Sequence, residues 1–206
     1  EYDLAREGGH SEHRVLHHKD NTGYEIERAL LAKVYRHPNI TILNHHFAID
    51  LITQHHLGVM VTSKTPNINC YGAYVLDTKS NAIETILAKV TCLATGGAGN
   101  VYATTTNPKV STGDGIAMVY RAKGHVQDME FVQFHPTGLF HEGQISFLIS
   151  EAVRGAGAEL KNKYMVPFMS KYDKRGSLAP RDIVSRSILQ EMNETNETHV
   201  LLDTTL

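Results

Sequence analysis

Apolar residues recur at helical spacing after a polar, histidine-rich stretch at residues 6–21, which we expect to be loop. Thr22 and Glu25 have the spacing of a capping box, and His37-Pro38 is expected to end the helix. Its predicted apolar face consists of Ile26, Ala29, Leu30 and Val34. One amphipathic helix is therefore expected here.

Short apolar runs predict strands after this helix. Residues 40–43 and 47–52 have the character of strands, and residues 71–76 and 83–87 alternate around a polar turn at 77–81. The pattern therefore predicts a compact, strand-rich insert that contains a hairpin.

Residues 89–94 form an apolar run of the kind that fills a buried parallel strand. A glycine-rich turn at 95–99 ends this run, and residues 116–121 are predicted to be helical, with the helix opened at 113–115 and closed at Lys123-Gly124. Alternation of helix and strand favours an α/β fold.

The pattern of expected secondary structure changes at about residue 129. Residues 131–136 are expected in loop, and residues 145–155 and 180–192 in helices. The second helix should bury Ile183, Val184, Ser187, Ile188 and Met192. We therefore divide the chain into two domains, residues 1–128 and 129–206.

Amino-acid composition excludes some classes of function. The chain has 206 residues, 41% of them hydrophobic, so it is long enough to bury a core. A net charge of -2 leaves no basic surplus for nucleic acid or anionic lipid, and no apolar run approaches the roughly 20 residues that span a bilayer. We expect a soluble, cytoplasmic protein without nucleic-acid or membrane partners, in which Cys70 and Cys92 are reduced. Glu1 and the uncapped apolar run at 200–203 suggest an internal piece of a longer protein.

Histidine is abundant, with thirteen in the chain, and His10, His13, His17 and His18 lie close together. Zinc sites need three or four ligands in fixed geometry, usually with cysteine or a carboxylate at a defined offset, and this loop has no cysteine. We therefore predict no metal site and interpret these residues as exposed or hydrogen-bonding histidines.

The glycine-rich turn at 95–99 has two interpretations of equal weight. It could hold a dinucleotide at the edge of a sheet, or it could be a tight exit from a strand. The chain contains no G-x-G-x-x-G fingerprint, so the pyrophosphate loop of a dinucleotide site is missing from it.

Eight short segments in a fixed order carry a resemblance that none would carry alone. They are Arg6-Glu7-Gly8-Gly9-His10-Ser11, Asp20-Asn21-Thr22-Gly23, Leu93-Ala94-Thr95-Gly96-Gly97, Thr106-Asn107-Pro108, Thr112-Gly113-Asp114-Gly115, Glu130-Phe131-Val132-Gln133-Phe134-His135-Pro136-Thr137, Glu151-Ala152-Val153-Arg154-Gly155 and Leu178-Ala179-Pro180-Arg181-Asp182-Ile183-Val184. Together they resemble the succinate dehydrogenase/fumarate reductase flavoprotein family, over essentially the whole chain.

This resemblance implies an α/β fold in two parts. Residues 1–128 would form part of a Rossmann-like FAD-binding domain that lacks the N-terminal GxGxxG unit, and residues 129–206 part of an α+β capping domain that closes over the substrate. FAD would be bound noncovalently. The residues expected near it are Ala48, Thr95, Gly96, Gly97 and Asp114.

Within the family, the segment around Glu7 resembles the branch that acts on L-aspartate. A substrate amino group is a cation that succinate lacks, and a carboxylate stabilises it by a charge-assisted hydrogen bond. Without the resemblance, Glu7 would be interpreted as a solvated loop charge. His135 and Ser150 are expected, by the same resemblance, to bind a substrate carboxylate.

Proton transfer is assigned by resemblance to Arg181, with Glu151 as its relay partner. Because an arginine pKa above 12 normally keeps the group charged, this role needs a desolvated site and a neighbouring carboxylate. Arg154 is interpreted as structural. Alanine follows Arg154-Gly155 where the family usually has glutamate, which puts one local ion pair in doubt.

The implied activity is FAD-dependent oxidation of L-aspartate to iminoaspartate, with oxygen or fumarate reoxidising the flavin, in the synthesis of quinolinate and NAD. The ligand would be L-aspartate or a related four-carbon dicarboxylate, and quinolinate synthase is a candidate downstream partner. The phosphate loop and the later histidine and arginine of the substrate clamp are missing, so we expect this piece to fold but to be inactive and to bind little FAD.

Two alternatives remain. A fumarate reductase or succinate dehydrogenase flavoprotein would share His135 and Arg181 but would have no use for Glu7. A non-catalytic cap or binding module would need no flavin at all.

Overall fold

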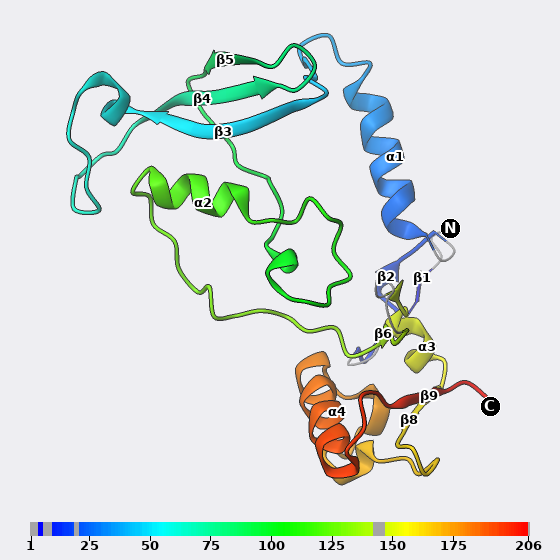
Figure 1. The fold of residues 1–206 in the computed structure, drawn as a ribbon. Coiled ribbons are helices and arrows are strands. Elements are labelled where there is room, and N and C mark those ends of the chain that lie inside the picture. The colour runs from blue at the N-terminus through cyan, green and yellow to red at the C-terminus, as the bar shows by residue number, and fades with distance from the viewer. Residues whose placement is uncertain (1–3, 6–9, 19–20, 142–146, 206) are drawn as a thin grey trace. The chain divides into compact units, whose positions relative to one another are not determined.

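The computed structural model describes residues 4–5, 10–18, 21–141 and 147–205, and the chain divides into two compact units. We call residues 37–131 the central unit, and residues 1–36 together with 132–206 the split unit. Each unit is described by itself (Figure 1). The predicted assignment of residues 1–128 to a FAD-binding domain and 129–206 to a capping domain stays a prediction.

The central unit is built on an antiparallel sheet in the order β3-β4-β5, with β3 at His46–Thr53, β4 at Cys70–Asp77 and β5 at Ala82–Leu87. The predicted strand at 47–52 and the hairpin around 77–81 are confirmed, and Asn81 completes the turn at a φ of 57°. A second predicted strand, at 40–43, is wrong, because these residues are not paired with any described strand.

Helix α2, Asp114–Arg121, packs along β3 and confirms the predicted helix (Figure 1). Gly113 precedes it at a φ of 80°, a left-handed conformation that glycine adopts without steric cost. At the other end, Arg121 donates from Nε to an Asp50 carboxylate oxygen at 3.0 Å and from Nη2 to the Ile49 carbonyl at 2.8 Å. Met118, on the inner face of α2, is fully buried.

The parallel strand predicted at 89–94 is wrong for this structure. The segment has no strand pairing, and all described strand pairs are antiparallel. Val90 is 83% exposed. A parallel strand needs a neighbouring strand on at least one side and cover on both faces, and none of the described segments supplies these. The short helix η2, Gly99–Val101, follows.

Helix α1, Thr22–Val34, confirms the predicted helix but not its cap. Asn21 is the N-cap, Thr22 accepts a hydrogen bond from the His18 amide at 2.9 Å, and Glu25 pairs with Arg28. No residue of α1 is buried, and Ile26, Ala29 and Leu30 of its predicted apolar face are exposed. Two short strands, β1 at Leu4–Ala5 and β2 at Val15–Leu16, pair before α1, and β2 lies within residues 6–21, which were predicted to be loop.

The rest of the split unit has its own core. Helix α4, Arg181–Thr195, packs with the antiparallel pair β8, Glu159–Lys161, and β9, Leu201–Asp203. The buried cluster consists of Leu160, Phe168, Met169, Ala179 and Val184, with Ile183 and Ile188 packed against it. The predicted α4 helix and its apolar face are confirmed. Two short helices, η3 at Met169–Lys171 and η4 at Gly176–Leu178, complete this region.

The helix predicted at 145–155 is wrong in its first part. Phe147–Leu148 forms strand β7, which pairs with β6, Gly138–Leu139, and helix α3 covers only Glu151–Gly155. Hydrogen bonds between Thr137 and Ile149 extend this pairing, which holds the chain extended up to the N-cap, Ser150.

No helix in the described ranges is long and apolar enough to cross a membrane. Both cysteines are free thiols in the structure, as predicted.

Candidate active site and cofactor loop

A carboxylate held between two guanidinium groups is the centre of the candidate site in the split unit. Glu151 opens helix α3, and its side chain is only 4% exposed. One carboxylate oxygen accepts from Nη2 of Arg154 at 3.0 Å, and the other accepts from Nε of Arg181 at 2.7 Å. Charge-assisted contacts of this kind are the strong hydrogen bonds of a protein interior, so the two cations fix the orientation of the carboxylate.

The carboxylate and the two guanidinium groups form a row, Arg181–Glu151–Arg154. Arg154 lies at the buried end of this row. Its side chain is fully buried, and it also donates from Nη1 to the Ser177 carbonyl of η4 at 2.7 Å. Burial lowers the pKa of Arg154, while the adjacent Glu151 opposes that shift. Its Nε is buried without a hydrogen-bond partner among the described residues. Arg154 and Glu151 thus form a buried ion pair, and loss of Glu151 would leave the Arg154 charge buried without a counter-ion.

Arg181 forms the accessible end of the row. It is the first residue of α4, and its side chain is 36% exposed. Besides Glu151, it contacts the side chain of Gln133, donating from Nη1 at 3.2 Å. A hydrogen bond from the Ser185 hydroxyl to the Phe134 carbonyl, 2.8 Å, ties the loop that carries Gln133 to α4. A cation at a helix N-terminus is electrostatically unfavourable, and here the Glu151 carboxylate offsets it.

His135 lies in the same loop and is half-buried. Its Nδ1 accepts from the backbone amide of Thr137 at 3.2 Å, so in the neutral ring the proton is on Nε2. Burial lowers the pKa of His135, and the nearby cation of Arg181 lowers it further. The ring is therefore set as a neutral donor rather than as an imidazolium.

Ser150 is the N-cap of α3, where its Oγ accepts from the Ala152 amide at 3.3 Å. Its hydroxyl proton remains available to a ligand, because that contact uses only a lone pair. Glu7, expected to meet the substrate amino group, lies outside the described residues.

The predicted cofactor residues belong to the central unit. The Gly113 amide donates to the Gly97 carbonyl at 3.2 Å, which holds the 95–97 turn beside the start of α2. Gly115 has no room for a side chain, because a Cβ there would lie 1.9 Å from the Thr95 hydroxyl oxygen. At Gly96 and Gly97, by contrast, nothing lies within 4 Å of a Cβ position. The turn is thus packed on one side and open on the other.

Asp114 opens α2 and accepts from the Thr112 hydroxyl at 2.6 Å. The N-cap, Gly113, offers no side-chain cap. Ala48 is half-buried in β3, beside a register shift that separates it from Asp50. Open glycine backbone, a helix N-terminus without a side-chain cap and an acidic side chain fit a ligand with phosphate and hydroxyl groups, as FAD has.

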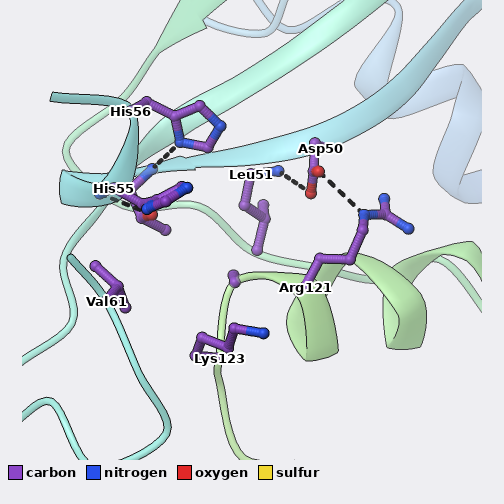
Figure 2. Close-up of a pocket in the computed structure, with 9 residues that line it drawn as sticks. Asp50, Leu51, His55, His56, Val61, Arg121 and Lys123 are labelled. Atoms are coloured by element: carbon purple, nitrogen blue, oxygen red, sulfur yellow. Dashed lines mark hydrogen bonds and ion pairs between the residues drawn. The ribbon is translucent and has the colours of Figure 1, made fainter. Parts of the chain in front are cut away.

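The central unit also contains a hollow of about 370 Å³ that the sequence did not predict. Figure 2 shows His55, His56, Arg121 and Lys123 around it, with the Asp50–Arg121 ion pair at one side. It contains none of the predicted site residues.

Sequence reasoning missed one side chain that contacts Arg181. Gln133 belongs to one of the recognised segments, yet nothing in its residue type marked it. Arg154 was interpreted as structural, and its buried contacts with Glu151 and the Ser177 carbonyl agree with that interpretation.

Comparison with known proteins shows the family to which the chain belongs. The family described as "FAD binding domain" matches residues 1–206, and the chain belongs to it. The expected α/β fold class, family resemblance and FAD cofactor are thereby confirmed.

Several proteins of known sequence that are similar to this chain are L-aspartate oxidases. The chain is 52% identical, over 98% of its length, to L-aspartate oxidase 1 of Ralstonia nicotianae, and 50% identical, over 97%, to the chloroplastic L-aspartate oxidase 2-a of Nicotiana tabacum. It spans 37% and 31% of these two proteins. Among solved structures it is similar to an E. coli quinol fumarate reductase, with a TM-score of 0.82 and 28% identity over 99% of this chain and 35% of that one.

Proposed function

We propose that this chain provides the proton-transfer and carboxylate-binding parts of a flavoenzyme that oxidises L-aspartate to iminoaspartate. The row Arg181–Glu151–Arg154 carries this proposal, because it places a half-exposed guanidinium on a buried, fixed carboxylate. The chain spans about a third of the L-aspartate oxidases it matches, so the activity is proposed for the full-length protein.

The proton path follows from the two short contacts of Glu151. When bound, FAD would supply the acceptor for a hydride from the substrate α-carbon, with oxygen or fumarate as the final acceptor. Arg181 would release its Nε proton to the Glu151 oxygen 2.7 Å away and take up, in exchange, the proton that leaves the substrate amino group. Arg154 holds that carboxylate in place from its buried side. Gln133 holds the edge of the Arg181 guanidinium in place.

Three side chains of this protein would bind the substrate: two neutral hydrogen-bond donors and one carboxylate. His135 would donate from Nε2, and Ser150 from its hydroxyl, to a substrate carboxylate. Glu7 would accept from the substrate amino group, which is the contact that distinguishes L-aspartate from succinate. About 50% identity to L-aspartate oxidases, against 28% to a fumarate reductase, supports this choice.

The cofactor set is part of the same proposal. Thr95, Gly96 and Gly97 would lie against noncovalently bound FAD, with Asp114 accepting from a cofactor hydroxyl and Ala48 contacting it through its backbone. We further propose a cytoplasmic enzyme whose product enters quinolinate and NAD synthesis, with quinolinate synthase acting next.

Reduction of the flavin in the full-length protein tests the proposal. L-Aspartate should bleach the flavin absorbance, and Arg181→Gln should slow this reaction by about 10²–10⁴-fold, as expected for loss of an acid–base group. Arg186→Gln is the matched control, since Arg186 also lies on α4 but pairs with Asp182 on an exposed face. Reduction by succinate but not by L-aspartate would overturn the assignment.

The 206-residue chain alone allows a second test. We expect little FAD binding, because the sequence has no G-x-G-x-x-G phosphate loop. A stoichiometric yellow complex after gel filtration with FAD would contradict this expectation.

A further inference from the structure

Three potential metal ligands gather on the sheet of the central unit, and none of them belongs to the site proposed above. His46, Asp77 and Glu84 each offer one ligand atom, and these atoms lie within 4.8 Å of one another. They come from three different strands, β3, β4 and β5.

The register of the sheet explains why they meet. His46 is paired with Asp77, and Asp77 in turn with Ala82. Glu84 lies two residues beyond Ala82 on β5, and side chains two residues apart on a strand share a face. A paired sheet therefore holds all three groups in place.

The imidazole of His46 is oriented as metal-binding histidines are. Its Nδ1 lies 2.8 Å from the Asn44 carbonyl, which accepts only from a protonated nitrogen. In the neutral ring, Nε2 is then unprotonated and carries a lone pair, and it faces Glu84. A second hydrogen bond that fixes the tautomer in this way is the usual outer-shell partner of a metal-ligating histidine.

The carboxylates complete the ligand set. The Ser80 hydroxyl and the Lys79 amide donate to the two oxygens of Asp77, which fixes its position in the turn. Nε2 of His46 and the nearer Glu84 oxygen are 3.8 Å apart. That gap is too long for a hydrogen bond but can be bridged by a metal about 2.0–2.2 Å from each.

We propose that His46, Asp77 and Glu84 bind a divalent transition metal of the Zn²⁺ class, with water completing the coordination shell. One imidazole and two carboxylates suit Zn²⁺, whereas Mg²⁺ and Ca²⁺ prefer oxygen ligands alone. The site would tie β3 to the β4–β5 hairpin.

Zinc titration of the chelator-treated chain tests the site. Calorimetry should show one equivalent of Zn²⁺ whose affinity falls by at least about tenfold in both His46→Gln and Glu84→Gln. Long-range ¹H–¹⁵N NMR should show the His46 ring nitrogens shifting as this equivalent is added. Glu84 is exposed, so Glu84→Gln should leave the circular dichroism spectrum and the melting temperature unchanged.

His45→Asn is the matched control. His45 is adjacent but exposed, and its φ of 62° is one that asparagine tolerates. This variant should bind Zn²⁺ as the unaltered chain does. The proposal is overturned if Glu84→Gln and His46→Gln keep full affinity, or if His45→Asn loses as much as they do.

Discussion

Two segments of the chain differ in how far they bury their apolar side chains: residues 151–205 of the split unit and residues 88–113 of the central unit. The first segment encloses its own buried cluster, with Leu160, Met169 and Val184 each at most 2% exposed. The second has Val90, Val101 and Val110 at 72% exposure or more. Burial of apolar side chains is the main favourable term in folding, so only the first segment stabilises itself.

This difference separates the proposed acid–base residues from the proposed cofactor residues. The row of Arg154, Glu151 and Arg181 is fixed by packing within its own segment, so its geometry is set without any ligand. The turn that holds Gly96 and Gly97 rests on α2 at one side only. We infer that acid–base geometry is built into this chain, whereas the cofactor loop depends on contacts from a bound ligand or from further protein.

The largest expected effect comes from Arg154→Met. It removes the buried cation beside Glu151, which then keeps only the partly exposed Arg181 as a partner, and it removes the donor to the Ser177 carbonyl. Loss of one partner of a buried pair typically costs about 3–5 kcal/mol of unfolding free energy. Urea denaturation followed by circular dichroism measures it.

Two further variants make this prediction specific. Glu151→Leu combined with Arg154→Met should lose less stability than Arg154→Met alone, because an apolar pair strands no charge. Arg186→Gln, in an exposed ion pair, should leave the urea midpoint unmoved. An unchanged midpoint in Arg154→Met would show that the pair does not hold this segment together.

A smaller effect on stability should distinguish the packed residues 151–205 from the exposed residues 88–113. Leu160→Ala opens a cavity in the buried cluster and should cost about 2–5 kcal/mol. Val90→Ala removes exposed methyl groups and should change stability by less than about 0.5 kcal/mol. Equal losses in the two variants, measured by the same denaturation, would mean that residues 88–113 are packed after all.

The smallest effect concerns the titration of His135. Its pKa is lowered in the folded chain by burial and by Arg181, so between the folded and unfolded pKa values the unfolded state binds more protons. Stability should therefore fall as pH drops through the unfolded value of about 6.5. NMR titration of the ring should give a midpoint below that value. Arg181→Gln should raise it and Arg186→Gln should not, whereas a midpoint at or above about 6.5 would contradict the burial of the ring.

Local patterns in the sequence determined several elements correctly. The helices α1, α2 and α4 and the β4–β5 hairpin follow from periodicity and turn residues, which record preferences over a few neighbouring positions. The same patterns failed at residues 89–94, because an apolar run indicates burial but not which strand will cover it. They failed again at 145–155, where pairing with β6 overrode a helical pattern.

The recognised segments determined the family and named Glu151, Arg181 and His135, but not how these residues meet. Glu151 and Arg181 are 30 positions apart, and Gln133 and Arg181 are 48 apart. Only packing of α3, α4 and the loop before β6 joins them, and only that packing buries the Arg154–Glu151 pair. The meeting of His46, Asp77 and Glu84 is likewise a property of strand register, which no local pattern encodes, because register depends on which strands pair.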